Sequence, residues 1–196
     1  MTKLHTLPGA DGFRMPGEFA QHSGTIMIFP ERPGSWHYDA APALPCFRKI
    51  WETIAAEETL WLLTSEKMRE KAVSMTADLK NVRILTIPQD DAWARDTAPT
   101  FVRNVDGEVR GIDWQFNAWG GNYDGLYADW AQDNALAGTF CEMAGITCYD
   151  AQHFVLEGGS IHADGEGTIL VTESCLLSKG RNPERTKAEI KQILFD

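Results

Sequence analysis

Apolar and polar positions along the first ninety residues predict strands and helices in alternation. Short apolar runs that end at a proline or a polar turn are typical of buried strands. Between these runs, apolar side chains recur at spacings of three and four, which is the period of an amphipathic helix. The predicted order is a strand at 25–29, a helix over about 40–57, a strand at 59–63, a helix that Ser65 caps and that ends near 79, and a strand at 82–87.

From residue 90 onward the pattern changes to paired strands. Asp106-Gly107 and Asp164-Gly165 each separate two short apolar runs, and an Asp-Gly pair supplies the positive φ angles of a tight hairpin turn. Helical sequence follows each hairpin, and Gly145 is the expected end of the first of these helices. The predicted elements are strands at 97–104 and 108–114, a helix over about 129–143, strands near 146–149 and at 154–157, hairpin strands at 159–163 and 168–172, and a last helix capped at Asn182-Pro183.

Hairpin, helix and strand therefore form a degenerate internal repeat. The sequence stops at Asp196 directly after the last helix, where a strand would complete the second copy. We expect a single truncated α/β domain over residues 1–196, the N-terminal half or somewhat more of a larger protein. Each hairpin begins just after an acidic residue, Asp96 in the first copy and Glu157 in the second. If a rotation relates the two copies, both carboxylates face one pocket.

The composition adds a charge preference and excludes several classes of protein. The chain has 196 residues, of which 43% are hydrophobic, and a formal net charge of −10 from 18 Lys and Arg against 28 Asp and Glu. No apolar run approaches the ~20 residues of a membrane-spanning helix, and no Lys/Arg-rich run offers the basic stripe that nucleic acid requires. The N-terminus has no apolar leader, so we expect a cytoplasmic protein. The acidic balance suits a small cationic ligand.

The residues Asp91, Trp93 and Asp96 form the first candidate site. They follow a strand-ending proline and precede a predicted strand, where α/β proteins expose functional side chains. Carboxylates accept the N–H donors of a planar guanidinium, and an indole face attracts a cation by about 0.5–2 kcal/mol. The structural alternative is that Asp96 pairs with Arg95 or caps a turn and that Trp93 belongs to the core.

Glu157 is the second candidate, because it follows three apolar residues that are expected to be buried. Removing a carboxylate from water lowers the stability of the fold by several kcal/mol unless the carboxylate has a cationic partner or a proton. Gly158 and Gly159 have no side chain, so backbone or ligand can approach Glu157 closely. The alternative is a structural ion pair with an internal arginine. The loop around Trp119, rich in glycine and aromatic residues, is either a pocket wall or a surface loop with one buried Trp.

Metal and thiol chemistry have weaker signals. His162 and Asp164 share one face of a predicted strand, as two metal ligands would, but Asp164 also begins a turn, so we expect it to act locally and no metal to bind. Cys175 lies near a helix start, which lowers a thiol pKa, yet a packed, inert cysteine is the simpler interpretation. The four cysteines show no CxxC spacing, so we expect them to form neither a zinc site nor disulfides: Cys46, Cys141, Cys148 and Cys175.

Several ordered segments together resemble the agmatine deiminase family, and the bacterial peptidylarginine deiminases share several of them. These segments run along essentially the whole chain: Met15-Pro-Gly-Glu-Phe19, the strand at 25–29, Trp93-Ala-Arg-Asp-Thr-Ala-Pro99, Trp119-Gly-Gly-Asn122, Leu126-Tyr-Ala-Asp129 and Leu156-Glu-Gly-Gly-Ser-Ile-His162. The resemblance implies a partial α/β-propeller of the pentein type, built from ββαβ modules with the C-terminal modules missing. It also implies hydrolysis of agmatine to N-carbamoylputrescine and ammonia, in putrescine biosynthesis, without metal or organic cofactor.

The resemblance also implies roles for single residues. In the family a cysteine thiolate attacks the guanidinium carbon, a histidine assists the departure of ammonia, and water resolves the covalent intermediate. Carried over by motif, Asp96 and Glu157 hold and polarise the guanidinium, and Trp93 lines the pocket. Asp91 of the first candidate site and Trp119 of the glycine- and aromatic-rich loop are further predicted substrate-binding residues. The family's Gly-His-x-Asp block and its C-terminal nucleophilic cysteine have no counterpart in this sequence.

We therefore expect a chain that has part of a substrate site but not the groups that break bonds, and that shows no turnover alone. The expected ligand is agmatine, with no cofactor, nucleic acid or membrane as partner, and the surfaces exposed by an incomplete ring favour a homo-oligomer. The alternatives are a noncatalytic guanidine- or polyamine-binding module, a relative of the peptidylarginine deiminases, and a metal hydrolase that uses His162 and Asp164.

Overall fold

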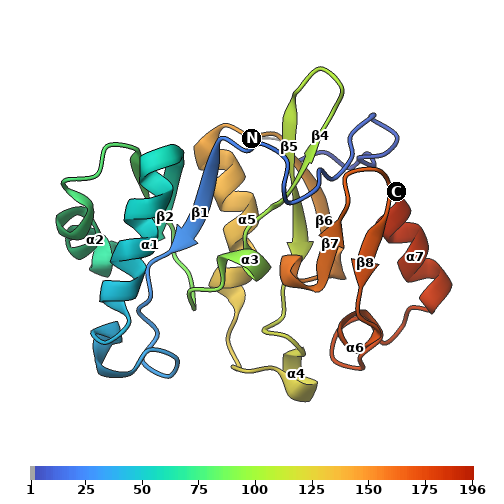
Figure 1. The fold of residues 1–196 in the computed structure, drawn as a ribbon. Helices are drawn as coiled ribbons and strands as arrows, with labels where there is room; N and C mark the ends of the chain where they lie inside the picture. The colour runs from blue at the N-terminus through green and yellow to red at the C-terminus, as the bar shows by residue number, and fades with distance from the viewer. Residues whose placement is uncertain (1–2) are drawn as a thin grey trace. The chain divides into compact units, whose positions relative to one another are not determined.

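The computed structural model describes residues 3–196, which divide into two compact units (Figure 1). The small unit is Gln21–Ala94, and the large unit comprises Met1–Ala20 and Arg95–Asp196. Both units contain helices and strands, so the α/β class is confirmed. The single truncated domain over residues 1–196 stays a prediction. Among the described residues, no helix has both the length and the apolar character needed to cross a membrane.

A parallel sheet forms the centre of the small unit. Its strands β1 (Gly24–Ile28), β2 (Thr59–Thr64) and β3 (Val82–Thr86) are ordered β1-β2-β3. The connections contain η1 (His37–Ala40), α1 (Leu44–Glu57), η2 (Glu66–Met68) and α2 (Arg69–Thr76). Trp51 of α1 packs in one core with Leu60 and Leu62 of β2, and all three are fully buried. The predicted alternation of strand and helix is confirmed.

Two details of the small unit differ from the prediction. The first helix begins at Leu44 and not near residue 40, because residues 38–40 adopt left-handed backbone, with φ between 53° and 61°, which an α-helix cannot continue. Ser65 does not cap the second helix with its side chain. Its hydroxyl donates to Glu31 Oε2 at 2.7 Å, and this bond orients the hydroxyl toward Glu31.

The large unit contains a mixed sheet and a separate hairpin. Strands β4 (Thr100–Arg103), β5 (Val109–Gln115) and β6 (Cys148–Val155) are ordered β4-β5-β6, with β4 antiparallel and β6 parallel to β5. Helix α5 (Ala131–Ala144) connects β5 to β6. The hairpin pairs β7 (Ile161–Ala163) with β8 (Ile169–Val171), and α7 (Lys187–Phe195) ends the chain. The short helices are α3 (Ala94–Thr97), α4 (Gly121–Asp124), η3 (Gly158–Ser160) and α6 (Glu173–Leu176).

The two predicted hairpins form at the Asp-Gly pairs. Gly107 and Gly165 have φ of 87° and 78°, and Gly145 ends α5 in the left-handed region at 72°. Hairpin, helix and strand occur in this order in β4-β5-α5-β6, and hairpin and helix recur in β7-β8-α7. The elements of the predicted internal repeat are therefore present in the expected order.

Three boundaries in the large unit were predicted wrongly. Thr97 ends the short helix α3 and does not begin a strand. The strands predicted near 146–149 and at 154–157 are one strand, β6, which ends before Glu157. Its first half pairs with β5 from Cys148 to Ala151, and after a bulge Val155 pairs with Gln115, so one strand contains both apolar runs. The last helix is capped by Thr186 and Glu189, which form a capping box, and not at Asn182, because both amide atoms of Asn182 bond to other backbone.

Gly111 of β5 sets the spacing between the sheet and α5. A Cβ atom on Gly111 would lie 2.5 Å from Cys141 Sγ and 3.1 Å from Pro99 Cβ. We predict that Gly111→Ala lowers the free energy of unfolding by about 1–3 kcal/mol, because the added methyl group overpacks a buried site. Urea denaturation followed by circular dichroism measures this. The matched control is Gly34→Ala, whose added Cβ meets nothing within 4 Å; equal stability of the two variants would contradict the prediction.

Candidate functional site

Glu157 lies just past the end of β6 and is buried. The residue is 2% exposed, and Phe154 and Leu156, which precede it, are fully buried. The apolar run therefore takes the carboxylate into the interior of the large unit, as the sequence predicted. A carboxylate in that position needs a cation, a proton or hydrogen-bond donors.

Arg181 supplies a cation for Glu157. Arg181 Nε donates to Glu157 Oε1 at 3.0 Å, and the two side chains are 11% and 3% exposed. Within residues 3–196 this is the one ion pair of Glu157. The internal pair that the sequence left open as an alternative is therefore present, and any ligand of Glu157 has to be accommodated beside it.

Gly158 and Gly159 allow the segment that contains Asp96 to approach closely. A Cβ atom on Gly158 would lie 2.3 Å from the Arg95 carbonyl oxygen, and one on Gly159 would lie 2.3 Å from Asp96 Oδ1. The Gly159 N–H donates to Asp96 Oδ1 at 3.0 Å. The two glycines thus place the Asp96 carboxylate against the segment directly after Glu157, so the two predicted acids lie in one region of the large unit.

Neutral donors hold the Asp96 carboxylate. Trp119 Nε1 donates to Asp96 Oδ2 at 3.3 Å, in addition to the bond from Gly159. The neighbouring Arg95 guanidinium bonds to both oxygens of Glu18, at 3.0 and 2.9 Å. An Asp96–Arg95 ion pair, the alternative considered from the sequence, is not the observed arrangement.

Burial raises the pKa of both carboxyl groups above their ordinary values. For Asp96, desolvation outweighs the hydrogen bonds from Gly159 and Trp119 and the charge of Arg95. For Glu157, desolvation outweighs the attraction of Arg181, and the negative charge of Asp96 raises the pKa further. The two acids influence each other, and within residues 3–196 the one arginine in an ion pair with either of them, Arg181, also lies 3.8 Å from the half-exposed Asp124 carboxylate. A planar monocation with several N–H donors fits this excess of negative charge.

Trp119 is fixed beside Asp96 by aromatic packing. Its ring lies edge-on to Phe116 and Tyr127, with centroid distances of 5.1 and 5.8 Å. Ala118 and Trp119 have φ of 54° and 65°, a left-handed backbone that residues other than glycine rarely adopt and that clusters at functional sites. The Trp119 side chain is therefore held next to one of the two acids, and its role in a pocket wall stays a prediction.

Asp91 and Trp93 belong to the small unit and are described within it. The Asp91 carboxylate is fully buried and accepts hydrogen bonds from the Ser35 hydroxyl, from Trp36 Nε1 at 2.8 Å and from the Ala92 N–H at 2.8 Å. Trp93 is 39% exposed, and its ring centroid lies 6.4 Å from that of Trp36. These contacts favour a structural role for Asp91, and ligand binding by Asp91 and Trp93 stays a prediction.

The Asp164 carboxylate serves its own hairpin turn. Asp164 Oδ1 accepts from the N–H groups of Glu166 and Thr168, at 2.8 and 3.0 Å, and these bonds hold its pKa below the ordinary value. The local role predicted for Asp164 is confirmed. Over residues 3–196, no group of three or more His, Cys, Asp or Glu side chains is arranged to hold a metal ion.

The cysteines lie in other surroundings. Cys46 is exposed in the small unit, Cys141 and Cys148 are buried beside Gly111, and Thr172 donates to Cys175 Sγ at 3.0 Å. In the described part of the chain, none of these thiols has a hydrogen bond to Asp96 or Glu157.

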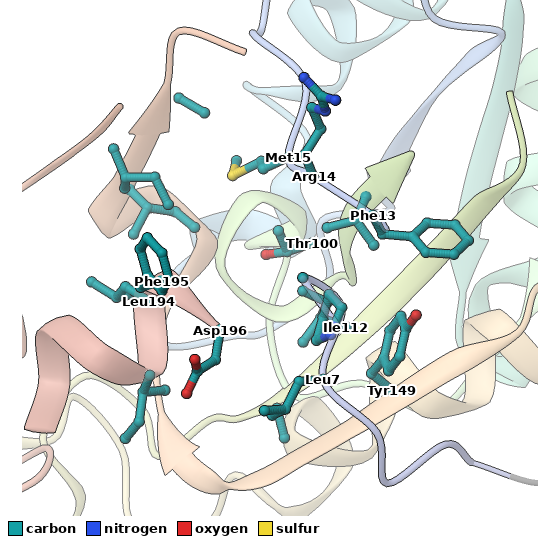
Figure 2. A pocket seen from close by; sticks show the side chains of 18 of the residues that line it. Leu7, Phe13, Arg14, Met15, Thr100, Ile112, Tyr149, Leu194, Phe195 and Asp196 are labelled. Atoms are coloured by element: carbon teal, nitrogen blue, oxygen red, sulfur yellow. The ribbon is translucent and has the colours of Figure 1, made fainter. Parts of the chain in front are cut away.

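A cavity of about 490 Å³ in the large unit is lined by neither acid. Figure 2 shows its mostly apolar wall, with Leu7 and Phe13 of the N-terminal segment, Ile112 of β5, Tyr149 of β6 and Phe195 at the end of α7. Charge and donor chemistry, and not cavity size, therefore locate the candidate site at Asp96 and Glu157.

The sequence interpretation missed Arg181 and the residues on either side of it. Asn117 Nδ2 donates to the Gly180 carbonyl oxygen at 2.7 Å, and Asn182 bonds to the backbone of Val155. The available signal was a buried glutamate that needs a cation, together with an arginine between a glycine and an Asn-Pro pair shortly before a helix.

Comparisons with known proteins relate the chain to deiminases. A family model described as Porphyromonas-type peptidyl-arginine deiminase matches residues 14–196. A putative agmatine deiminase of Selenomonas ruminantium is 53% identical over 190 residues, which are 96% of this chain and 51% of the relative. The agmatine deiminase of Ectopseudomonas mendocina is 48% identical over 194 residues, which are 99% and 52% of the two chains. A solved agmatine deiminase of Enterococcus faecalis matches all of this chain and 53% of its own, with a TM-score of 0.94 and 41% identity. The chain thus spans about half the length of these relatives.

The raised pKa of Asp96 predicts a stability difference that depends on pH. The folded protein holds the proton of the Asp96 carboxyl group more tightly than the unfolded chain does. Below the ordinary carboxyl pKa of about 3.9, Asp96 therefore does not lower the free energy of unfolding. As the pH rises from there through the raised pKa of the folded protein, the free energy of unfolding falls. Asp96→Asn removes this loss of stability, so we predict that its Tm relative to wild type rises from about pH 4 up to the raised pKa of Asp96 and is constant at higher pH.

Thermal unfolding at a series of pH values measures the trend. Asp106→Asn is the matched control, because it removes one exposed carboxylate from an Asp-Gly turn that asparagine also favours. A Tm difference for Asp96→Asn that does not change over this pH range would show that Asp96 is not desolvated.

Proposed function

Because the chain belongs to the Porphyromonas-type peptidyl-arginine deiminase family, we propose that it forms the guanidinium-binding part of an agmatine deiminase. Such an enzyme hydrolyses agmatine to N-carbamoylputrescine and ammonia. Relatives named agmatine deiminase, at 48% and 53% identity, support agmatine as the substrate. The observation on which the proposal rests is the pair formed by the buried Glu157 and the half-buried Asp96, because one internal arginine leaves the two ionised acids in need of a further cation.

In the proposed complex the two carboxylates accept N–H donors from one guanidinium plane. Hydrogen bonds to charged groups contribute about 1.5–3 kcal/mol each, and desolvation strengthens them relative to bonds in water. Trp119 fixes Asp96 Oδ2 and adds an indole whose face attracts cations. The carboxylates also polarise the guanidinium, so that its carbon becomes a better target for a nucleophile.

Hydrolysis requires groups besides these acids. The family resemblance implies a cysteine thiolate that attacks the guanidinium carbon and a histidine that transfers protons. No cysteine of residues 3–196 has a hydrogen bond to either acid, and the relatives are about twice as long as this chain. We therefore propose that the chain alone binds agmatine without hydrolysing it, and that the other half of the family's length completes the active site.

The finer fold assignment and the biology belong to the same proposal. We assign β4-β5-α5-β6 and β7-β8-α7 to successive modules of an α/β-propeller of the pentein type, on the strength of their repeated element order. A cytoplasmic location, a homo-oligomer and a role in putrescine biosynthesis are expected with the agmatine deiminase assignment.

A noncatalytic guanidine- or polyamine-binding module is the second candidate, because none of the described thiols has a hydrogen bond to either acid. Co-expression with the C-terminal half of the Selenomonas ruminantium relative distinguishes the two. Ammonia release from agmatine by the pair, and not by either part, supports the deiminase. A stable complex of the two parts that binds agmatine without releasing ammonia supports the binding module.

We predict that the 196-residue chain binds agmatine with one-to-one stoichiometry in isothermal titration calorimetry. Asp96→Asn and Glu157→Gln each weaken this binding about tenfold or more, because each removes charge-assisted bonds to the guanidinium. Asp106→Asn leaves the affinity unchanged. Putrescine, which has no guanidinium, binds more weakly than agmatine. The affinity for an N-acetyl-arginine amide, compared with that for agmatine, tests the peptidylarginine alternative. Unchanged affinity in both site variants would refute the assignment of the site.

We also predict that agmatine binding strengthens as the pH rises. Since burial raises the pKa of both carboxyl groups, part of the protein holds a proton at mildly acidic pH, and a bound cation lowers both pKa values and displaces that proton. The affinity is therefore lower at pH 4 than at pH 7 and levels off above the pKa values of the free protein. Calorimetry in two buffers of different ionisation enthalpy detects the released proton; binding without proton release at any pH in this range would contradict the prediction.

A further inference from the structure

The candidate site has two parts, Glu157 just past β6 and the loop that contains Trp119. They are connected by three consecutive residues, Gly180, Arg181 and Asn182, which we call the GRN junction. Asn182 pairs with the Val155 backbone at 3.0 and 2.8 Å, which attaches the junction to the end of β6 two residues before Glu157. The Gly180 carbonyl oxygen accepts from Asn117 Nδ2 at 2.7 Å, which attaches it to the loop that contains Trp119. The junction is therefore fixed at both ends.

Arg181 lies at the centre of the junction between two carboxylates. Nε donates to Glu157 Oε1 at 3.0 Å, while Nη1 lies 3.8 Å from Asp124 Oδ1 and 3.4 Å from Ser178 Oγ. Asp124 ends α4, directly after the Trp119 loop. A Cβ atom on Gly180 would lie 2.3 Å from Asp124 Oδ1, so glycine at 180 is required for this approach. One guanidinium thus contacts the end of β6 and the end of α4.

We propose that Arg181 is a positioning residue that keeps Glu157 an ionised acceptor for a guanidinium ligand and links it to the Trp119 loop. The ligand in this inference rests on the proposed function, but the effect of Arg181 on Glu157 does not. Arg181 acts through Glu157 and not by contact with the ligand.

The chemistry of the ligand explains why such a residue is needed. A guanidinium has only N–H donors, so each acid that binds it has to be ionised and to accept. The charged groups around Glu157 are Arg181 and Asp96, with Asp124 on the far side of Arg181 and Arg95 near Asp96. Without Arg181, the like charge of Asp96 and the desolvation both favour a protonated Glu157, whose O–H donor would oppose the N–H groups of the ligand.

Lysine cannot fully replace arginine at this position. The two contacts of Arg181 use different nitrogens of one rigid fork, Nε toward Glu157 and Nη1 toward Asp124. A lysine ammonium is a single point charge, so it can maintain the ionisation of Glu157 but not both contacts at once. The proposal therefore separates the effect of charge from the effect of geometry.

The test follows the ionisation of Glu157 by carbon-detected NMR of its carboxyl group in the 196-residue chain without ligand. In Arg181→Gln the midpoint moves upward by about one pH unit or more, because a neighbouring arginine lowers a carboxyl pKa by about that amount. In Arg181→Lys most of the increase is reversed. Arg185→Gln is the matched control, because Arg185 lies at the surface and bonds to the His153 carbonyl oxygen at 3.4 Å; its midpoint equals that of wild type. An unchanged midpoint in folded Arg181→Gln overturns the proposal.

A second measurement covers the case in which Arg181→Gln does not fold, because Glu157→Gln together with Arg181→Gln removes both buried charges. If Arg181 acts through Glu157, this double variant binds agmatine as weakly as Glu157→Gln alone. A further loss of tenfold or more in the double variant would mean direct contact between Arg181 and the ligand and would overturn the positioning role. Failure of wild type to bind agmatine would refute the proposed function, whereas the NMR midpoints would still decide the role of Arg181.

Discussion

The ion pair between Glu157 and Arg181 is the interaction on which the rest of the site depends. The apolar run of β6 takes the glutamate out of water, and a buried carboxylate without a partner costs several kcal/mol. Arg181 offsets this cost and also contacts the carboxylate of Asp124, so the end of the sheet and the Trp119 loop are held by one side chain. Breaking such a pair is far more destabilising than its presence is stabilising, which makes the pair a constraint on where the surrounding segments can lie.

The second constraint is the close approach of the Gly158-Gly159 segment to the Arg95-Asp96 segment. It explains why the site attracts a cation. Gly158 and Gly159 remove the two Cβ atoms that would collide with Arg95 and Asp96, so a second carboxylate is placed in the same region. That carboxylate is bound by Gly159 and Trp119, which are neutral donors, and its own neighbour Arg95 is used by Glu18. The raised pKa of each acid is the consequence of this arrangement. A guanidinium that binds here satisfies charge and hydrogen bonding in one step, which links the local packing to the function expected of the family.

Much of the fold could be predicted from local signals, because periodicity and turn chemistry act over a few residues. The parallel strands of the small unit and the hairpins at Gly107 and Gly165 are examples. Two of the errors arose where a side chain bonds to a group that is distant in the sequence. Ser65 donates to Glu31 in place of capping its helix, and Asn182 pairs with Val155 in place of capping α7.

The same contrast between local signals and distant partners applies to the candidate site. Burial of Glu157 and the need for glycine beside it could be inferred from neighbouring residues, whereas its partner Arg181 is 24 positions away and only the fold identifies it.

The central claim is that one guanidinium binds both acids. The most direct measurement is carbon-detected NMR of the Asp96 and Glu157 carboxyl groups during titration with agmatine at neutral pH. We predict that both resonances shift along curves with the same Kd and saturate at one equivalent. A shift of only one resonance, or two different Kd values, would contradict it.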